Sequence, residues 1–312
     1  MKKIAFLFAM LLLLSACSQA PQTEEEVPGL SGFIKIDGSS TVYPVTEAVA
    51  EEFSLVHPDV KVTVGLSGTG GGFKKFCRAE IDINDASRPI KDSEITVCKE
   101  TAIDYTSLSI AYDGMAILVH PENTWVESIT VEELKKIWEP EAQNKIMKWN
   151  QIRPEWPDEN INLYGAGTAS GTFDYFTEAV VGESGKSRGD YTASEDDNVL
   201  VQGVANDKNA LGFLGLAYYE ENKEKLKLVP VDNGSGPVLP SVETVKNGSY
   251  SPLSRPLYIY VNSKALEKPE VVAFVQFYLE TVGLLAEEVG YIPMSDKEYA
   301  AEVKKFEESL KK

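Results

Sequence analysis

The sequence predicts an α/β fold with two lobes, and two observations lead to this prediction. Short β-like runs alternate with helical patterns: FIKID precedes VTEAVAEEFSLV, and VKVTVGL precedes FKKFCRAE. Such alternation is typical of βαβ units around a parallel sheet. The chain has 312 residues, and about 280 of them follow the N-terminal segment described below, a length that suits two domains of ordinary size.

Later segments continue this pattern. The helical period predicts five more helices, over 131–138, 172–181, 195–205, 269–282 and 296–310. Two apolar strand runs, MAILVHP (115–121) and PLYIYVNS (256–263), lie far apart in the sequence. Both are candidates for crossings between two lobes, which would make the first lobe discontinuous. The expected boundaries are 33–114 with 256–312 for the first lobe and 115–255 for the second.

The first residues have the layout of an export signal. Lys2 and Lys3 precede an apolar run over 4–14, and small residues follow up to Cys17. This layout is typical of a signal peptide, here 1–16, and the apolar run is too short for a stable membrane span. The ending LSAC resembles the bacterial lipobox, which implies that Cys17 carries a lipid such as palmitate and anchors the chain outside the cytoplasm. The alternative is ordinary secretion with a free Cys17.

Residues 17–32 are polar and acidic and are expected to form a flexible tether. Two cysteines, Cys77 and Cys98, remain after Cys17. In an exported protein an even pair favours a disulfide over a metal site. Two buried thiols are the alternative, because the pairing cannot be read from the sequence.

The balance of charge excludes some partners. The formal net charge is −18, so nucleic acid and anionic membrane surfaces are poor candidates. The same field would repel an anionic ligand, and any anion site must therefore use local, oriented donors. No H-E-x-x-H, C-x-x-C or EF-hand spacing occurs, and we predict no metal and no cofactor. With two histidines and no G-x-S-x-G, a Ser–His–Asp hydrolase has little support.

Three loops made of glycines and hydroxyl residues run directly into helical patterns: DGSSTVYP (37–44), SGTGGG (67–72) and GAGTASGT (165–172). The start of a helix has unpaired N–H groups and the positive end of the helix dipole, so it attracts anions. Glycine lets the backbone approach closely, and serine and threonine add hydroxyl donors. Together the three loops predict a cage for one small oxyanion. The spacing does not fit a P-loop or a dinucleotide fingerprint.

Three further segments occur with these loops over residues 33–312: IDINDASRPI, NALGFLGLAYY and PLYIYVNSKALEKPEVVAFVQFYLE. In these segments and in their order, the chain resembles the periplasmic phosphate-binding proteins. Members of this family are the substrate-binding components of the phosphate ABC transporter. The resemblance implies a two-lobed Venus-flytrap fold of the type II periplasmic-binding-protein class. It also implies a monomer that binds inorganic phosphate between its lobes, makes or breaks no covalent bond and delivers the ion to a membrane permease.

The resemblance also implies the site residues. The family's hydroxyl and N–H donors fall on Ser40 and Thr41 in the first loop and on Thr69, with Ser67 close by, in the second. The loop between the lobes supplies three more residues at a helix start: Ser170, Gly171 and Thr172.

Two positions depart from the family pattern. The family's aspartate that accepts the phosphate proton falls on Ser87, and the family's arginine, four residues before the serine at Ser170, falls on Ala166. Arg88, beside Ser87, is therefore our hypothesis for the charged partner of the anion. The proton-accepting carboxylate is left unassigned, with Asp85 as a minor candidate. Arg188 is expected to be a solvated surface cation rather than a cleft residue.

Three alternatives to a phosphate receptor stay open. The first is a receptor for another tetrahedral oxyanion, such as sulfate, molybdate or arsenate. The second is a phosphatase with Ser40 or Ser170 as nucleophile, for which no paired base or metal motif is present. The third is a surface adhesin or signalling lipoprotein. Four tryptophans in one segment are expected to pack inside the second lobe: Trp125, Trp138, Trp149 and Trp156.

Overall fold

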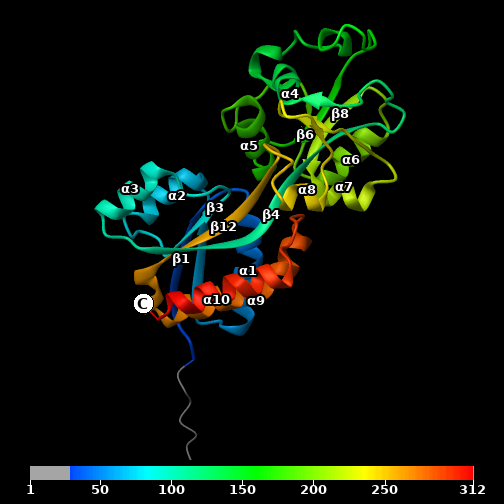
Figure 1. Cartoon of the computed structure of the whole chain (residues 1–312). Helices are drawn as coiled ribbons and strands as arrows, with labels where there is room; N and C mark the ends of the chain where they lie inside the picture. The colour runs from blue at the N-terminus through cyan, green and yellow to red at the C-terminus, as the bar shows by residue number, and fades with distance from the viewer. Residues whose placement is uncertain (1–28, 312) are drawn as a thin grey trace, which may run out of the picture.

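The structure, a computed structural model, describes residues 29–311 and consists of two halves joined by long strands (Figure 1). The predicted signal peptide, Cys17 and most of the predicted tether lie outside the described residues. The main sheet has nine strands in the order β2-β1-β3-β12-β4-β8-β6-β7, with β9 beside β4. This sheet continues from one half into the other.

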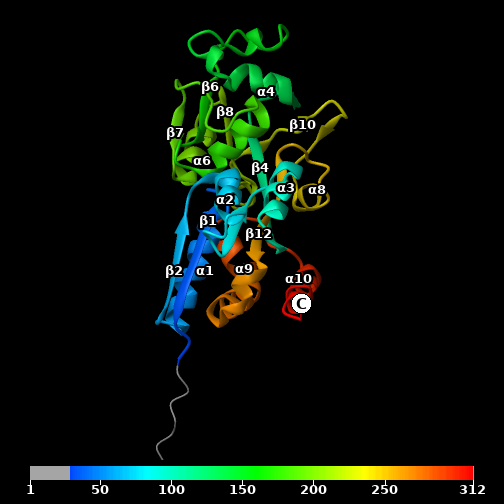
Figure 2. The same cartoon turned by 90° about the vertical axis from the view of Figure 1, so that its left-hand side faces the viewer.

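The first half begins with the predicted βα alternation. Its parallel strands are β1 (Gly32–Gly38), β2 (Val60–Gly65) and β3 (Ile83–Ala86), and Figure 2 shows β1 and β2 side by side. The helices between and after them are α1 (Tyr43–Val56), α2 (Gly68–Phe76) and α3 (Asp92–Glu100). Helix α1 buries Val45, Val49 and Phe53 at helical spacing. It packs on α9 (Pro269–Glu288), which is followed by α10 (Asp296–Ser309).

Two strands carry the chain between the halves. Strand β4 (Tyr105–Val119) pairs with the antiparallel β12 (Ser254–Asn262) along its first part. Its last five residues, from Met115, pair instead with β8 (Ala210–Gly215). One continuous strand therefore belongs to both halves. The two apolar runs expected to be crossings lie in β4 and β12.

The second half has its own layers. Its strands are β5 (Ile129–Thr130), β6 (Asn162–Ala166), β7 (Thr192–Ser194), β8, β9 (Lys227–Leu228), β10 (Val231–Asp232) and β11 (Pro237–Val238). Its helices are α4 (Val131–Trp138), α5 (Gly171–Phe176), α6 (Asp197–Ala205), α7 (Leu216–Asn222) and α8 (Val242–Lys246). Helix α5 continues as a π-helical turn, η3 (Thr177–Val181), and shorter 3₁₀ turns are η1 (Pro140–Ala142), η2 (Trp149–Gln151) and η4 (Ser263–Glu267). The five predicted helices are confirmed, with ends that differ by a few residues.

The buried apolar residues divide at the crossing strands. Along β4 the core of the first half ends at Ala111 and that of the second half starts at Met115. Along the return path the change falls between Leu253 and Leu257. The second core contains Trp138, Trp149 and Trp156, with Trp125 packed against it. The expected packing role of the tryptophans is confirmed.

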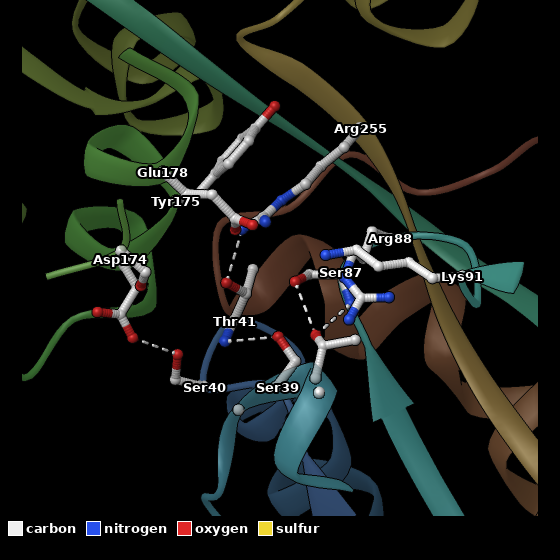
Figure 3. Close-up of a pocket in the computed structure, with 14 residues that line it drawn as sticks. Ser39, Ser40, Thr41, Ser87, Arg88, Lys91, Asp174, Tyr175, Glu178 and Arg255 are labelled. Carbon is white, nitrogen blue, oxygen red and sulfur yellow. Dashed lines mark hydrogen bonds between the residues drawn. The ribbon is translucent and has the colours of Figure 1, made fainter. Parts of the chain in front are cut away.

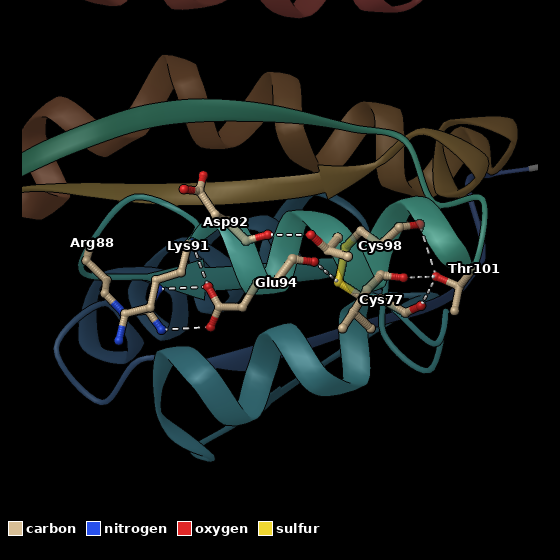
Figure 4. The surroundings of a disulfide bond; sticks show 9 residues. Cys77, Arg88, Lys91, Asp92, Glu94, Cys98 and Thr101 are labelled. Carbon is tan, nitrogen blue, oxygen red and sulfur yellow. Dashed lines mark hydrogen bonds and ion pairs between the residues drawn. A yellow bond between two sulfur atoms is a disulfide. The ribbon is translucent and has the colours of Figure 1, made fainter.

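A disulfide joins Cys77 at the end of α2 to Cys98 on α3 (Figure 4). Both side chains are buried. The first residues of α2 border the cavity described below, and Lys91 borders it just before α3 begins. The bond therefore holds one wall of that cavity together.

Loss of this disulfide should lower the free energy of unfolding by about 3 kcal/mol, because the bond closes a loop over a sequence separation of 21 residues. The measurement is urea unfolding of the oxidised and reduced chain. The double variant Cys77→Ser/Cys98→Ser is the control and should not respond to reductant. Equal midpoints for the oxidised and reduced chain would contradict the prediction.

Candidate anion-binding cleft

A cavity of about 230 Å³ lies between the two halves (Figure 3). Since a water molecule takes about 30 Å³, this volume holds a small ion together with several waters. Loops of the first half, helix α5 with the turn after it, and one residue of β12 form the lining. The lining residues are Ser39, Ser40, Thr41, Gly68, Thr69, Gly70, Ser87, Arg88, Lys91, Asp174, Tyr175, Glu178, Ser184 and Arg255.

The first loop, between β1 and α1, is held in place by the backbone. The N–H of Ser39 donates to the carbonyl of Asp85 at 3.0 Å, and the N–H of Thr41 donates to the Ser39 hydroxyl at 3.2 Å. Gly38 has φ +147°, and a Cβ there would lie 2.1 Å from the Asp85 carbonyl oxygen. Only glycine fits this contact, which brings the loop against the end of β3.

The second loop meets the loop between β3 and α3 through hydroxyl groups. The Thr69 hydroxyl oxygen accepts a hydrogen bond from the N–H of Ser87 at 3.2 Å, and the two side-chain oxygens are also 3.2 Å apart. Ser67, predicted as a ligand residue, does not line this cavity. Its N–H and hydroxyl donate to Asp37 instead. Burial opposes ionisation of Asp37, but Lys75, 2.5 Å away, and Ser67 together lower its pKa.

Arg88 lines the cavity with its charge already paired. It donates to both carboxylate oxygens of Glu94, at 2.9 and 2.8 Å. The hydrogen bonds that Arg88 donates to Glu94 raise the pKa of Arg88, although burial opposes this shift. Glu94 also accepts from the N–H of Lys91 at 2.9 Å and so caps the start of α3. A guanidinium group held this way is oriented before any ligand arrives.

Arg255, which we had not predicted, is the second arginine of the cavity. It donates to the Thr41 hydroxyl at 2.7 Å and to Asp113 on β4 at 3.2 Å. Its guanidinium carbon lies 3.3 Å from the centre of the Tyr175 ring. Burial raises the pKa of Asp113, and Arg255 partly offsets the rise. The sequence could have indicated this residue, because Arg255 immediately precedes the apolar run expected to cross between the lobes.

The predicted residues of the third Gly-rich loop belong to the second half and lie where this half contacts the first loop. The Thr41 hydroxyl donates to the Gly171 carbonyl at 3.2 Å, and a Cβ on Gly171 would lie 2.6 Å from the Cα of Thr41. Ser170, Gly171 and Thr172 line a neighbouring cavity of about 310 Å³, which they share with Ser40. The hydroxyl of Ser170 caps α5 by accepting from the N–H of Thr172 at 3.1 Å.

The structure therefore divides the predicted set. One cavity contains five of the predicted residues: Ser40, Thr41, Ser87, Thr69 and Arg88. The helix start at 170–172 borders the adjacent cavity, and Ser67 lies outside both. Asp85 lines neither cavity, because it is buried below the first loop, where burial raises its pKa well above the ordinary value.

The expectation that Arg188 is a solvated surface cation was wrong. Its side chain is 2% exposed and lies inside the second half. It pairs with Asp190 at 2.5 Å and donates to the carbonyls of Ile137 and Ile146 at 3.0 and 2.8 Å. The polar stretch around it suggested exposure, but packing of that stretch against the end of α4 buries the guanidinium. Arg188 does not line the cavity.

Comparison with known proteins gives the following matches. A family model described as the PBP superfamily domain matches residues 18–281. Protein SphX of Synechocystis sp. is 52% identical over 293 residues, which cover 93% of this chain and 85% of the relative. The phosphate-binding protein PstS of Staphylococcus saprophyticus is 39% identical over 305 residues, which cover 96% of this chain and 92% of the relative.

Solved structures are similar along most of the chain. A possible phosphate binding protein from Planctomyces limnophilus has a TM-score of 0.87 and 48% identity, with 90% of this chain and 100% of that chain covered. An ABC-type phosphate transport receptor from Vibrio cholerae has a TM-score of 0.62 and 24% identity, with 84% and 100% covered. The expected α/β periplasmic-binding-protein fold is confirmed by these matches.

Asp190→Asn should test the structural role of the Arg188 pair. Arg188 lowers the pKa of Asp190 to about 2 from 3.8, a shift equivalent to about 2 kcal/mol at 1.36 kcal/mol per unit. Since the Asp190 side chain is 21% exposed, solvent screening reduces this to about 1–2 kcal/mol. Because the folded-state pKa is depressed, this stability is present above the ordinary pKa and is lost as the pH falls through about 2.

The measurement is urea unfolding of the native chain and the variant at neutral and at strongly acidic pH. We expect the difference between the two chains to shrink in acid. A difference that does not change with pH would rule out the ion pair as its source.

Proposed function

Since the chain belongs to the PBP superfamily, and its relatives there include SphX and PstS, we propose that it is an extracytoplasmic solute-binding protein that binds inorganic phosphate and delivers it to an ABC permease. The relative from Staphylococcus saprophyticus is named for phosphate binding. The relatives match this chain along nearly its whole length, so the comparison includes both halves and the cleft between them.

One observation about the cavity carries the proposal: two arginines, hydroxyl groups and glycine backbone from separate loops converge on it. Arg88 and Arg255 supply charge, and Thr69 and Ser87 supply hydroxyls. Such local donors can replace the hydration shell of an oxyanion although the whole protein is strongly acidic. Arg255 supplies the charge from the junction of the halves, and Arg88 supplies it from the first half.

We propose that the two halves are lobes with the boundaries given above, 33–114 with 256–312 and 115–255. The division of the buried core between Ala111 and Met115 supports this assignment. A hinge movement of β4 and β12 would shift the contact between Thr41 and Gly171. The N–H groups at the start of α5 could then turn toward the anion, so that Ser170, Gly171 and Thr172 complete the site only in one arrangement of the lobes.

The setting of the protein is part of the proposal. A lipid on Cys17 would anchor the chain to the outer face of a bacterial membrane as a monomer, and the 77–98 disulfide suits that oxidising location. Binding without turnover is proposed because the relative PstS is named for phosphate binding.

Isothermal titration of residues 18–312, stripped of bound phosphate, tests the function. We expect saturable binding of one phosphate per chain. No heat of binding over a wide concentration range would contradict the proposal. Sustained hydrolysis of an aryl phosphate would instead favour an enzyme.

Substitution of either cavity arginine should weaken phosphate binding. A charge-assisted hydrogen bond contributes about 1.5–3 kcal/mol, so Arg255→Gln and Arg88→Gln should each raise Kd by roughly ten-fold to a hundred-fold. Arg78→Gln is the matched control, because Arg78 is 56% exposed and pairs with Glu80 away from the cavity. A variant that folds and keeps normal affinity removes that arginine from the site.

A further inference from the structure

The two sides of the cavity differ in the hydrogen-bonding groups that they offer. Arg88, Lys91 and Arg255 present N–H donors (Figure 3). The corner formed by Ser40 and Asp174 is different. The Ser40 hydroxyl donates to a carboxylate oxygen of Asp174 at 2.8 Å, so its single hydrogen is already used. Both side chains in this corner therefore have only lone pairs left for a ligand.

The charges in and around the cavity are unevenly compensated. Glu94 neutralises Arg88, and Asp113 neutralises Arg255. Asp174 is only partly exposed and has no ion-pair partner within residues 29–311. The lining and its ion-pair partners contain three cationic and four anionic side chains, so their net charge is −1. The cationic residues are Arg88, Lys91 and Arg255, and the anionic ones are Asp174, Glu178, Glu94 and Asp113. This negative balance opposes the binding of any anion, whether or not it carries a proton, so discrimination between anions must come from the local contacts.

A ligand fits this arrangement when it carries both negative oxygens and an O–H group. Its negative oxygens can accept from Arg255 and from the donors of the first half. Its O–H can donate to Asp174, which turns a repulsive contact into a charge-assisted hydrogen bond. A carboxylate facing an oxygen that has no hydrogen leaves two acceptors in contact, and this contact is unfavourable.

From this we infer that Asp174 is the specificity-determining residue of the cleft. It restricts the ligand to oxyanions that carry a proton, such as hydrogen phosphate. Fully deprotonated oxyanions, such as sulfate, are excluded. The inference rests on the proposed phosphate-binding function. It assigns the proton-accepting role to the second half of the molecule, whereas the sequence left that role unassigned, with Asp85 in the first half as a minor candidate. Glu178, one helical turn further along, also lines the cavity, but it is exposed and lacks the hydrogen bond from Ser40 that holds Asp174 in place.

The native chain tests the inference without any substitution. Monofluorophosphate is a phosphorus oxyanion in which fluorine replaces the hydroxyl, so its dianion has no O–H to donate at neutral pH. Titration with phosphate, monofluorophosphate and sulfate should give at least ten-fold weaker binding for the last two. Equal affinity for phosphate and monofluorophosphate would overturn the inference and leave the proposed function intact. Absence of phosphate binding would overturn the proposed function itself.

Substitution gives the second test. Asp174→Asn adds N–H donors at the same position, so sulfate binding should strengthen at least ten-fold while phosphate binding weakens. Glu183→Gln is the control, since it removes one negative charge from the same half at a side chain that is 72% exposed. It should leave both affinities unchanged. A folded Asp174→Asn protein that still rejects sulfate would refute the assignment, and if that variant does not fold, the monofluorophosphate comparison decides.

Discussion

The Arg255–Asp113 pair connects the parts of the molecule on which the cleft depends. The two residues lie directly opposite each other in the antiparallel pairing of β12 with β4, so the strand register itself brings the charges together. From this position the guanidinium reaches the first loop at Thr41 and packs on Tyr175 of α5. A buried arginine needs such partners, because the loss of water around an unpaired charge is strongly unfavourable. One ion pair therefore joins both crossing strands, a ligand loop and the second half.

The first half holds its side of the cleft as a single unit. Gly38 allows the first loop to contact the end of β3, and the hydroxyls of Thr69 and Ser87 join the second loop to the loop between β3 and α3. The disulfide fastens α2 to α3. Preorganised donors of this kind do not have to be ordered when the ligand binds, and the affinity is correspondingly higher.

An acidic protein that binds an anion combines two opposing requirements. Its overall charge repels the ligand at long range, but salt screens that field within about 8–10 Å. Binding then depends on the few groups that contact the ion. The cleft places paired arginines on one side and Asp174 on the other, so the same contacts that attract an oxyanion also test whether it carries a proton.

The features that depend on neighbouring residues could be predicted from the sequence alone. The βα alternation, the five later helices and the position of the Gly-rich loops before helices follow from local periodicity and turn chemistry. Which polar groups face the cavity depends on the folded arrangement of distant segments. Ser67 turned to Asp37, Arg188 became buried in the second half, and Arg255 and Asp174 reached the cleft from segments that look ordinary in sequence. The physical reason is that the pairing register of β4 with β12 and the packing of the two halves set these positions, and neither is encoded in any short stretch of the chain.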